Sequence, residues 1–408
     1  MNSNSITVLG LAAVLAAGAV PCLGGDADFV PGRLLVGYRD QTDAAAVERT
    51  LSVRGLSIRR QMTALSVGAV EVPEAAAEAT LASLRQSGLF AYVERDYYGH
   101  TAANPNDPSY LSQWHLPRIG APLAWSLTTG SATVVVAVVD SGVYNDHPDL
   151  SSKLVPGWNF VKRSSNTADV LGHGTAVAGA VAAATNNAIG VAGVNWASRI
   201  MPLVAVDEND FSPYSAIAEA IQYAADRGAR VINVSIGGRN TSETLQRAVD
   251  YAWAKGALVF ASAMNQAVSQ PFYPAACANA VAVSATDRND RLASFSNFGD
   301  WITLAAPGTS ILTTADGGGY SFWNGTSFAS PIAAGVAALI LSVNPKLTNA
   351  EALAILKQTA DRPAGAAPDT TRDTYFGWGR VNAYRAVLAA TPPRDRGTKE
   401  IERLRHRR

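Results

Sequence analysis

The sequence predicts an α/β protein in which a mainly parallel sheet is sandwiched by helices, preceded by a small α+β unit of ferredoxin-like type. Two observations predict the sheet and its boundary. From about residue 103 onward, Val-, Ile- and Ala-rich runs alternate with helical periods, as in a parallel sheet covered on both faces. A segment with two prolines and two asparagines separates this part from a shorter strand–helix–strand pattern that precedes it.

The composition is that of a globular protein with a large core. The chain has 408 residues, of which 48% are hydrophobic and 16% charged. Lys plus Arg and Asp plus Glu both total 33, so nothing indicates a nucleic-acid partner. Only Cys22 and Cys277 are present, which argues against a disulfide framework, and no Cys/His cluster has the spacing of a zinc site.

The N-terminus contains an uncharged apolar run at residues 6–20, which is shorter than the roughly 20 residues of a membrane span. It is typical of a signal-peptide core, and Ala17-Gly18-Ala19 is an A-x-A cleavage site. The preceding MNSNS lacks the usual Lys or Arg. We expect a signal peptide at 1–25, a secreted protein and no membrane span.

Residues 28 to about 101 contain six predicted elements. In order they are strand RLLVGYR, helix DAAAVERTLSVRG, strands SIRRQ and SVGAVEVP, helix EATLASLRQSG and strand FAYVERDYY. This is the split βαβ order of ferredoxin-like units. The segment TAANPNDPS follows, and we place the domain boundary near residue 102.

Buried strands and amphipathic helices are predicted in the larger part. The strands are expected at 133–139, 229–236, 257–263, 280–285 and 301–306, and the helices at 214–228 and 242–256. Active sites of such sheets lie at the carboxyl ends of the strands. The last eighteen residues hold seven Arg or Lys against three acids, and we interpret 391–408 as a solvated basic tail.

The stretch WNGTSFASPIAAG places Ser327 where an apolar helix begins. Taken alone, such a serine is usually a helix cap, and Pro331 is tolerated in a first turn. The alternative is that Ser327 is a nucleophile at a helix N-terminus, which requires a base and an acid elsewhere in the chain.

Asp140 and His173 are the candidate partners of Ser327. Asp140 follows the first strand of the larger part, where a lone Asp is usually a turn residue. His173 opens the Ala/Gly-rich helix of GHGTAVAG. That segment is not a dinucleotide-binding pattern, because Val177 occupies the third glycine position and no strand leads into it.

Together these motifs resemble the subtilisin-like serine protease family, whose triad has the order Asp, His, Ser. The matching stretches are VVDSGV, GHGTAVAG, INVSIGG, SFSNFG, LAAPG, NGTSFASP and FGWGRVNA. The resemblance implies a secreted endopeptidase, in its thermitase-like branch, that acts on polypeptides as a monomer without a catalytic cofactor. It also implies that 26–102 is an inhibitory and chaperoning pro-domain for a peptidase domain at 103–390.

In this family His173 would take the proton of Ser327, and Asp140 would orient the imidazole. Asn265 matches the asparagine that stabilises the oxyanion. Ser235-Ile236-Gly237 matches the segment that pairs with the substrate backbone as an added strand.

Three positions depart from the family pattern. Leu171 stands where an Asp often precedes G-H-G-T, and Ala176 replaces a frequent second His; we expect changed packing from both. Met264 replaces the glycine before Asn265, where a side chain crowds the pocket or displaces the asparagine. This leaves an inactive, peptide-binding protein as the alternative. An α/β-hydrolase esterase is disfavoured, because the G-x-S-x-G elbow is missing and the triad order differs.

The resemblance also implies structural calcium, held by hard oxygen ligands. Asp107 and Asp149 match carboxylates that bind calcium in thermitase-like members. The loop ATNNAIGV would add the Asn187 amide and the carbonyl oxygens of Ala184, Ile189 and Val191.

The predicted specificity pocket has walls of Ser235-Ile236-Gly237 and Ser262-Ala263-Met264, with Phe272 at its floor. Because two large side chains reduce its volume, we expect a preference for a small residue before the scissile bond. VERDYYGHTA resembles the end of subtilisin pro-domains, which predicts self-cleavage between Ala102 and Ala103.

Overall fold

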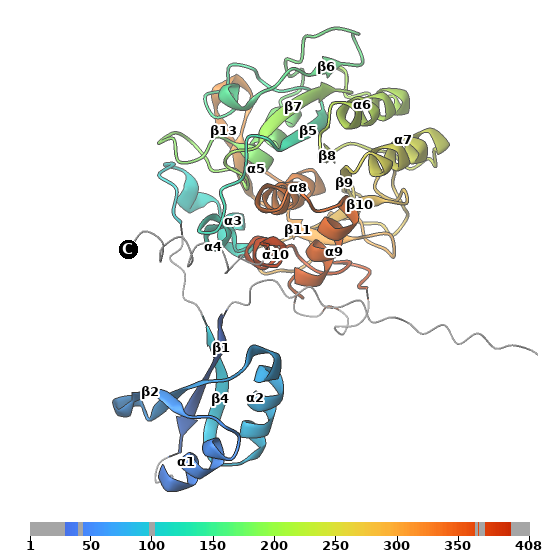
Figure 1. Cartoon of the computed structure of the whole chain (residues 1–408). Helices are drawn as coiled ribbons and strands as arrows, with labels where there is room; N and C mark the ends of the chain where they lie inside the picture. The colour runs from blue at the N-terminus through green and yellow to red at the C-terminus, as the bar shows by residue number, and fades with distance from the viewer. Residues whose placement is uncertain (1–28, 40–43, 98–102, 364–365, 367–371, 393–408) are drawn as a thin grey trace, which may run out of the picture.

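The computed structural model describes residues 29–39, 44–97, 103–363, 366 and 372–392 (Figure 1). The predicted signal peptide at 1–25, the predicted cleavage after Ala102 and most of the tail at 391–408 lie outside these residues. The described residues form a small N-terminal unit and a larger C-terminal domain.

The N-terminal unit has the predicted order of elements. They are β1 (Phe29–Tyr38), α1 (Ala44–Ser52), β2 (Ile58–Met62), η1 (Thr63–Leu65), β3 (Val67–Glu71), η2 (Glu74–Ala76), α2 (Ala77–Gln86) and β4 (Phe90–Tyr97), where η is a 3-10 helix. The sheet is antiparallel, in the order β2-β3-β1-β4. Alternate residues of β1 and one face of α2 bury Leu34, Val36 and Leu84 completely. The ferredoxin-like prediction is confirmed.

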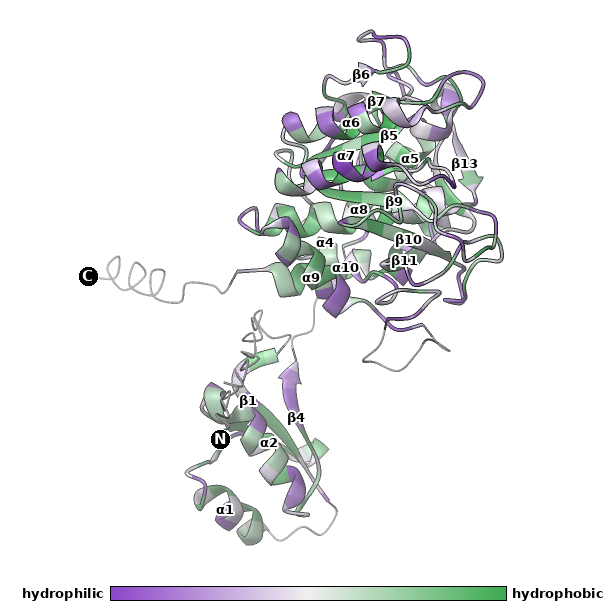
Figure 2. Cartoon of the chain, turned by 90° about the vertical axis from the view of Figure 1, so that its right-hand side faces the viewer, coloured by the Kyte–Doolittle hydropathy of each residue, from purple (hydrophilic) through white to green (hydrophobic). Residues whose placement is uncertain are grey.

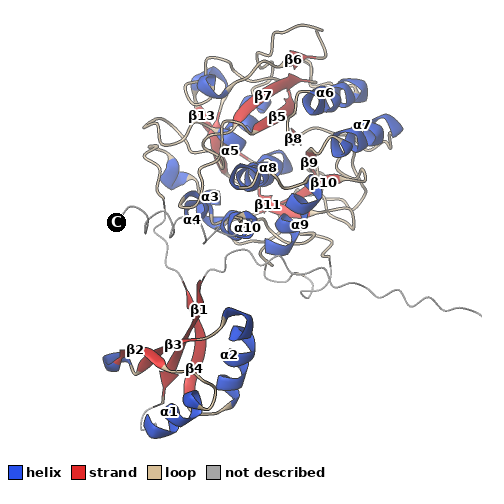
Figure 3. Ribbon diagram, in the orientation of Figure 1, coloured by secondary structure: helices blue, strands red, loops and turns tan. Residues whose placement is uncertain are grey.

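The larger domain is built on a seven-stranded parallel sheet in the order β11-β10-β9-β8-β5-β7-β6 (Figure 3). Its strands are β5 (Val135–Asp140), β6 (Trp158–Asn159), β7 (Arg199–Val204), β8 (Val231–Val234), β9 (Leu258–Ser262), β10 (Ala280–Thr286) and β11 (Leu304–Pro307). A hairpin of β12 (Ile311–Thr314) and β13 (Tyr320–Trp323) stands apart from it.

Helices cover both faces of this sheet. One face carries α5 (His173–Ala182) and α8 (Thr326–Val343), and the other carries α6 (Tyr214–Asp226) and α7 (Glu243–Ala254). The other helices of the domain are η3 (Tyr110–Ser112), α3 (His115–Arg118), α4 (Ala121–Trp125), η4 (Ser151–Lys153), η5 (Asp316–Gly318), α9 (Asn349–Thr359) and α10 (Ala383–Ala390). Hydrophobic residues dominate the strands and α8, whereas α6 and α7 carry hydrophilic residues as well (Figure 2). The predicted sandwich is confirmed.

Helix α8 is the central helix of the domain. The helix is long and apolar enough to span a membrane, but its residues from Thr326 to Leu341 are buried inside the domain. Its apolar side chains therefore form part of the core. Pro331 lies inside the helix, four residues after Ser327. Because proline has no N–H, the Ser327 carbonyl loses its helical donor, and the Ser235 hydroxyl donates to it instead at 2.9 Å.

The strand predictions were correct in position, with two differences. The strand expected from residue 301 begins at Leu304, because the Ile302 N–H turns back to the Gly299 carbonyl. Strands β6 and β7 were not predicted: β6 has two residues, and Pro202 interrupts the run of β7. The tertiary fold pairs β7 with β5, which places the loop after β7 beside Asp140.

Candidate active site

The end of β5 and the start of α5 bring Asp140 and His173 together. The Nδ1 atom of His173 lies 2.7 Å from Oδ1 of Asp140, which is buried. The Ser141 N–H donates to the same oxygen at 2.8 Å. An ionised carboxylate only accepts hydrogen bonds, so Nδ1 carries the hydrogen and Nε2 is left able to accept a proton.

The turn before His173 is held by Asp169, a residue that the sequence analysis did not identify. Its Oδ1 accepts hydrogen bonds from the Ser141 hydroxyl at 2.7 Å and from the N–H groups of Leu171 and Gly172 at 3.0 and 2.9 Å. Its Oδ2 accepts from the N–H and the hydroxyl of Thr175. A carboxylate just before a helix is a recognisable capping signal, and it could have been found.

Two residues that depart from the family pattern, Leu171 and Ala176, lie in or next to this turn. The carboxylate that holds the turn stands at Asp169, so Leu171 is free to project outward and is 40% exposed. Ala176 is fully buried inside α5.

His173 has an elevated pKa. Burial lowers it, but the charge of Asp140 and its hydrogen bond to the imidazole outweigh burial, and Asp169 and Asp210 add to this effect, so the pKa of His173 is raised above its ordinary 6.5. The protonated ring is stabilised by these three carboxylates, which suits a group that must carry positive charge transiently.

Ser327 is the second residue of α8 and is 7% exposed. Its hydroxyl donates to the Ser235 carbonyl at 3.3 Å. Below it, the buried side chain of Asn233 donates to the Ser235 hydroxyl at 2.9 Å and accepts from Ser330 at 2.7 Å. The polar Asn233 in an otherwise apolar strand is a second residue that sequence reasoning missed, and it anchors the start of α8 to β8.

The rings of His173 and Phe328 lie 5.8 Å apart, centroid to centroid. Phe328 follows Ser327 directly, so the structure gathers all three predicted catalytic residues at the carboxyl edge of the sheet.

Asn265 follows β9, and its side chain is anchored to the start of α8. Its Oδ1 accepts from the Thr326 N–H at 2.9 Å and from the Thr326 hydroxyl at 3.0 Å. The amide nitrogen Nδ2 is therefore the end left to donate. A Cβ built on Gly325 would lie 3.5 Å from both Asn265 Nδ2 and the Ser327 nitrogen, so these two donors flank one point above the helix start.

Met264 adopts a left-handed backbone with φ of 72°, a conformation that glycine adopts without strain. Its sulfur accepts a weak hydrogen bond from the Ser262 hydroxyl at 3.5 Å. Met264 lines the cleft, and Asn265 makes its hydrogen bonds with Thr326.

A cleft of about 500 Å³ opens at His173. Of the predicted pocket residues, Ser235, Ile236, Gly237 and Met264 line it. Ser262, Ala263 and Phe272 are buried and are not among its lining residues. The cleft is also lined by Leu171, Val206, Asp210 and Ser212. The last three follow β7, which β8 and β5 separate in the sheet from β9, the strand before Met264, so they lie on the opposite side of the cleft.

The predicted calcium ligands converge on the loop at 184–191. Asp149 accepts from the Asn187 side chain at 2.8 Å and from the Val191 N–H at 3.1 Å, and its own carbonyl accepts from the Ala184 N–H. Asp107 accepts from the Asn186 N–H at 2.7 Å, and its other oxygen is buried without a partner among the described residues. Burial raises the pKa of Asp107, and the nearby charge of Asp149 adds to this rise.

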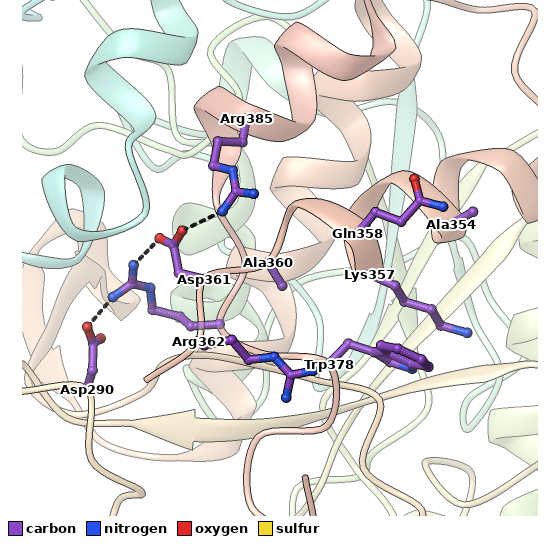
Figure 4. Close-up of a pocket in the computed structure, with 10 residues that line it drawn as sticks. Asp290, Ala354, Lys357, Gln358, Ala360, Asp361, Arg362, Trp378 and Arg385 are labelled. Atoms are coloured by element: carbon purple, nitrogen blue, oxygen red, sulfur yellow. Dashed lines mark hydrogen bonds and ion pairs between the residues drawn. The ribbon is translucent and has the colours of Figure 1, made fainter. Parts of the chain in front are cut away.

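A larger cavity, about 960 Å³, lies elsewhere (Figure 4). Arg380 bridges Asp290 and Asp361 there, and Arg385 also pairs with Asp361 at 3.3 Å. These ion pairs tie the ends of α9 and α10 to the loop after β10, and we regard this cavity as structural.

Comparison with protein families identifies this architecture. The model of the subtilase family matches residues 131–379, and that of the fervidolysin N-terminal prodomain matches residues 20–96. The chain belongs to the subtilase family. It is accordingly a serine endopeptidase with an N-terminal prodomain, which confirms the resemblance inferred from the motifs.

Relatives of this subtilase cover both of its parts. It is 40% identical to the thermophilic serine proteinase of Bacillus sp. strain AK1, over 88% of each chain. It is 43% identical to thermitase of Thermoactinomyces vulgaris, over 69% of this chain and 99% of that protein. A protease structure from Pseudoalteromonas arctica superposes with a TM-score of 0.66 at 34% identity, covering 71% of this chain and all of the other.

Proposed function

We propose that this subtilase is secreted as a zymogen and hydrolyses peptide bonds through Asp140, His173 and Ser327. The observation that carries the proposal is the 2.7 Å contact between Asp140 and His173, in a cleft that is also lined by Ser235, the residue whose carbonyl accepts the hydrogen bond of the Ser327 hydroxyl. Carboxylate, imidazole and hydroxyl in this arrangement form a charge-stabilised base and a nucleophile.

In the proposed reaction, the Ser327 hydroxyl leaves the Ser235 carbonyl and gives its proton to Nε2 of His173. The Oγ atom attacks the scissile carbonyl carbon, and the oxyanion lies between Asn265 Nδ2 and the Ser327 N–H. The imidazolium, stabilised by Asp140, returns the proton to the leaving amine, and an acyl-enzyme remains. Water repeats the sequence, releases the acid and restores the serine.

The substrate is proposed to lie as an extended strand along Ser235-Ile236-Gly237. The residue before the scissile bond then faces Met264, with Ser262, Ala263 and Phe272 behind. Because the methionine side chain occupies part of the cleft, a small residue such as alanine is preferred.

Calcium is proposed as a structural ion of the loop at 184–191. The unpartnered buried oxygen of Asp107 and the proximity of Asp149 fit a divalent cation with oxygen ligands. Asn187 at present donates its amide hydrogen to Asp149, so its amide must turn before its oxygen can bind the ion, together with the carbonyl groups of Ala184, Ile189 and Val191. Among the described residues no three His, Cys, Asp or Glu side chains form a metal cluster, so this ion depends on amide and backbone oxygens.

Maturation is proposed to follow the predicted domain plan. The signal peptide at 1–25 is removed on secretion, and the prodomain at 26–102 is cut from the peptidase domain at 103–390 between Ala102 and Ala103. The prodomain is thus a partner of the same chain, besides polypeptide substrates.

The test is labelling of the mature protein by a fluorophosphonate probe, which reacts only with an activated serine. We expect stoichiometric labelling of wild type and none of Ser327→Ala, with N-terminal sequencing placing Ala103 first in wild type only. Correctly processed protein that binds peptides but is not labelled would instead be the peptide-binding alternative.

A further inference from the structure

Asp210 is an acidic residue of the substrate cleft whose charge adds to the raised pKa of His173 but which makes no hydrogen bond with the proposed triad among the described residues. It lies in the loop between β7 and α6 and lines the cleft together with His173, Leu171 and Val206. Among the described residues that line this cleft, none is Lys or Arg. Asp140, the other acid of the lining, is buried and paired with His173, so Asp210 is the carboxylate that faces solvent.

The loop holds Asp210 in a defined position. Asp207 accepts from the N–H groups of Asn209 and Phe211, both at 2.9 Å, and its own N–H donates to the Phe211 carbonyl at 2.9 Å. Asp210 adopts a left-handed backbone with φ of 64° and donates its N–H to the Asp207 carbonyl. Its carboxylate has no hydrogen-bond or ion-pair partner in the part of the chain that the structure describes.

The position in the cleft indicates which substrate residue it meets. Successive side chains of an extended strand point to opposite sides. When the residue before the scissile bond faces Met264, the preceding residue faces the opposite wall, where Leu171, Val206 and Asp210 lie. Two apolar side chains and a carboxylate match the methylene stem and charged head of Lys or Arg.

We propose that Asp210, with Leu171 and Val206, forms a subsite for a Lys or Arg side chain at the second residue before the scissile bond. This specificity rests on the proposed function of the same cleft. The predicted processing site has Thr101 there, and a tethered segment does not need the extra affinity, because its effective concentration is high.

The test uses mature enzyme and peptides with alanine before the scissile bond and Lys, Arg, Met or Glu before that alanine. Wild type should cleave the Lys peptide about five-fold better in kcat/KM than the Met peptide, which is the range of a solvent-accessible ion pair, and the Glu peptide least. The Lys-to-Met ratio should shrink at 1 M salt.

Asp210→Asn should bring the Lys-to-Met ratio to about one, and Asp210→Lys should favour the Glu peptide. Glu208→Gln is the matched control, because Glu208 is an acid of the same loop that pairs with Lys162 outside the cleft; it should leave the ratio unchanged. A wild-type ratio of one, or a ratio that survives Asp210→Asn, overturns the proposal.

Failure of the triad is distinguishable from failure of the subsite. Enzyme that is labelled by fluorophosphonate and cleaves Met and Lys peptides equally lacks only the subsite. If no peptide is cleaved, calorimetric binding of the Lys and Met peptides to the mature wild-type protein shows whether the subsite exists, because this measurement needs no catalysis.

Discussion

Replacing Asp169 by Asn tests whether the turn before α5 positions the catalytic base. The carboxylate accepts hydrogen bonds from Ser141, Leu171 and Gly172 through one oxygen and two from Thr175 through the other. An amide keeps one acceptor oxygen and sets an NH₂ group against donors on the other side. In one orientation of the amide, the two hydrogen bonds with Thr175 are lost. In the other orientation, the hydrogen bonds with Ser141, Leu171 and Gly172 are lost.

The size of the effect follows from this count. Leaving donors of a buried turn without acceptors costs about 2 kcal/mol, and in a domain of this size that lowers the thermal midpoint by roughly 4–8 °C. Misplacement of the imidazole lowers kcat on the order of ten- to a hundred-fold with a smaller change in KM. Loss of the Asp169 charge also lowers the pKa of His173.

The assay is the pH dependence of kcat and KM, measured beside thermal unfolding. Asp287→Ala is the control, because Asp287 holds the loop after β10 by two hydrogen bonds, to the N–H groups of Asn289 and Arg291, away from the cleft. It should lose stability and keep kcat. If Asp169→Asn loses only as much activity as this control, and its pH profile does not move, the turn does not position His173.

The remaining predictions concern the other parts of the site. Asn265→Ala should lower kcat about a hundred- to a thousand-fold with little change in KM, measured on a peptide substrate with correct folding checked by circular dichroism. Because neutral His173 is the proposed base and its pKa is raised, kcat/KM should rise with pH through a midpoint above 6.5. The stability that the ion pair of His173 with Asp140 contributes has the opposite pH dependence. It is fully present below pH 6.5 and is lost as the pH rises through the pKa of His173 in the folded protein. Met264→Gly should relieve the left-handed backbone and increase cleavage after Leu and Phe relative to Ala, and an unchanged ratio in a peptide series would remove Met264 from the specificity pocket. EDTA should lower the thermal midpoint of wild type but not that of Asp149→Ala, and equal shifts in both would place any ion elsewhere.

The local sequence determined most of the elements that form and marked the residues proposed to carry the chemistry. Short apolar runs and period-3.6 hydrophobic patterns depend on neighbours a few positions away, so the ferredoxin-like order and the strands β5, β8, β9 and β10 could be predicted. The same holds for the glycines that flank His173. A Cβ at Gly174 would lie 2.1 Å from the Gly142 carbonyl oxygen, a close approach that only glycine allows.

Strand order and the supports of the site were decided by the tertiary structure. Nothing in the short β6, or in β7 with its Pro202, indicates that they pair beside β5, since strand pairing depends on contacts between distant residues. Asn233 is an ordinary polar residue in the sequence and becomes a support only when β8 meets α8. Asp169 could be found from the sequence as a helix cap, but its contact with Ser141 forms only when β5 meets the turn before α5. Asp210 is likewise one acid in a loop until the pairing of β7 with β5 places that loop across the cleft from Met264, because a subsite is a property of distances between elements.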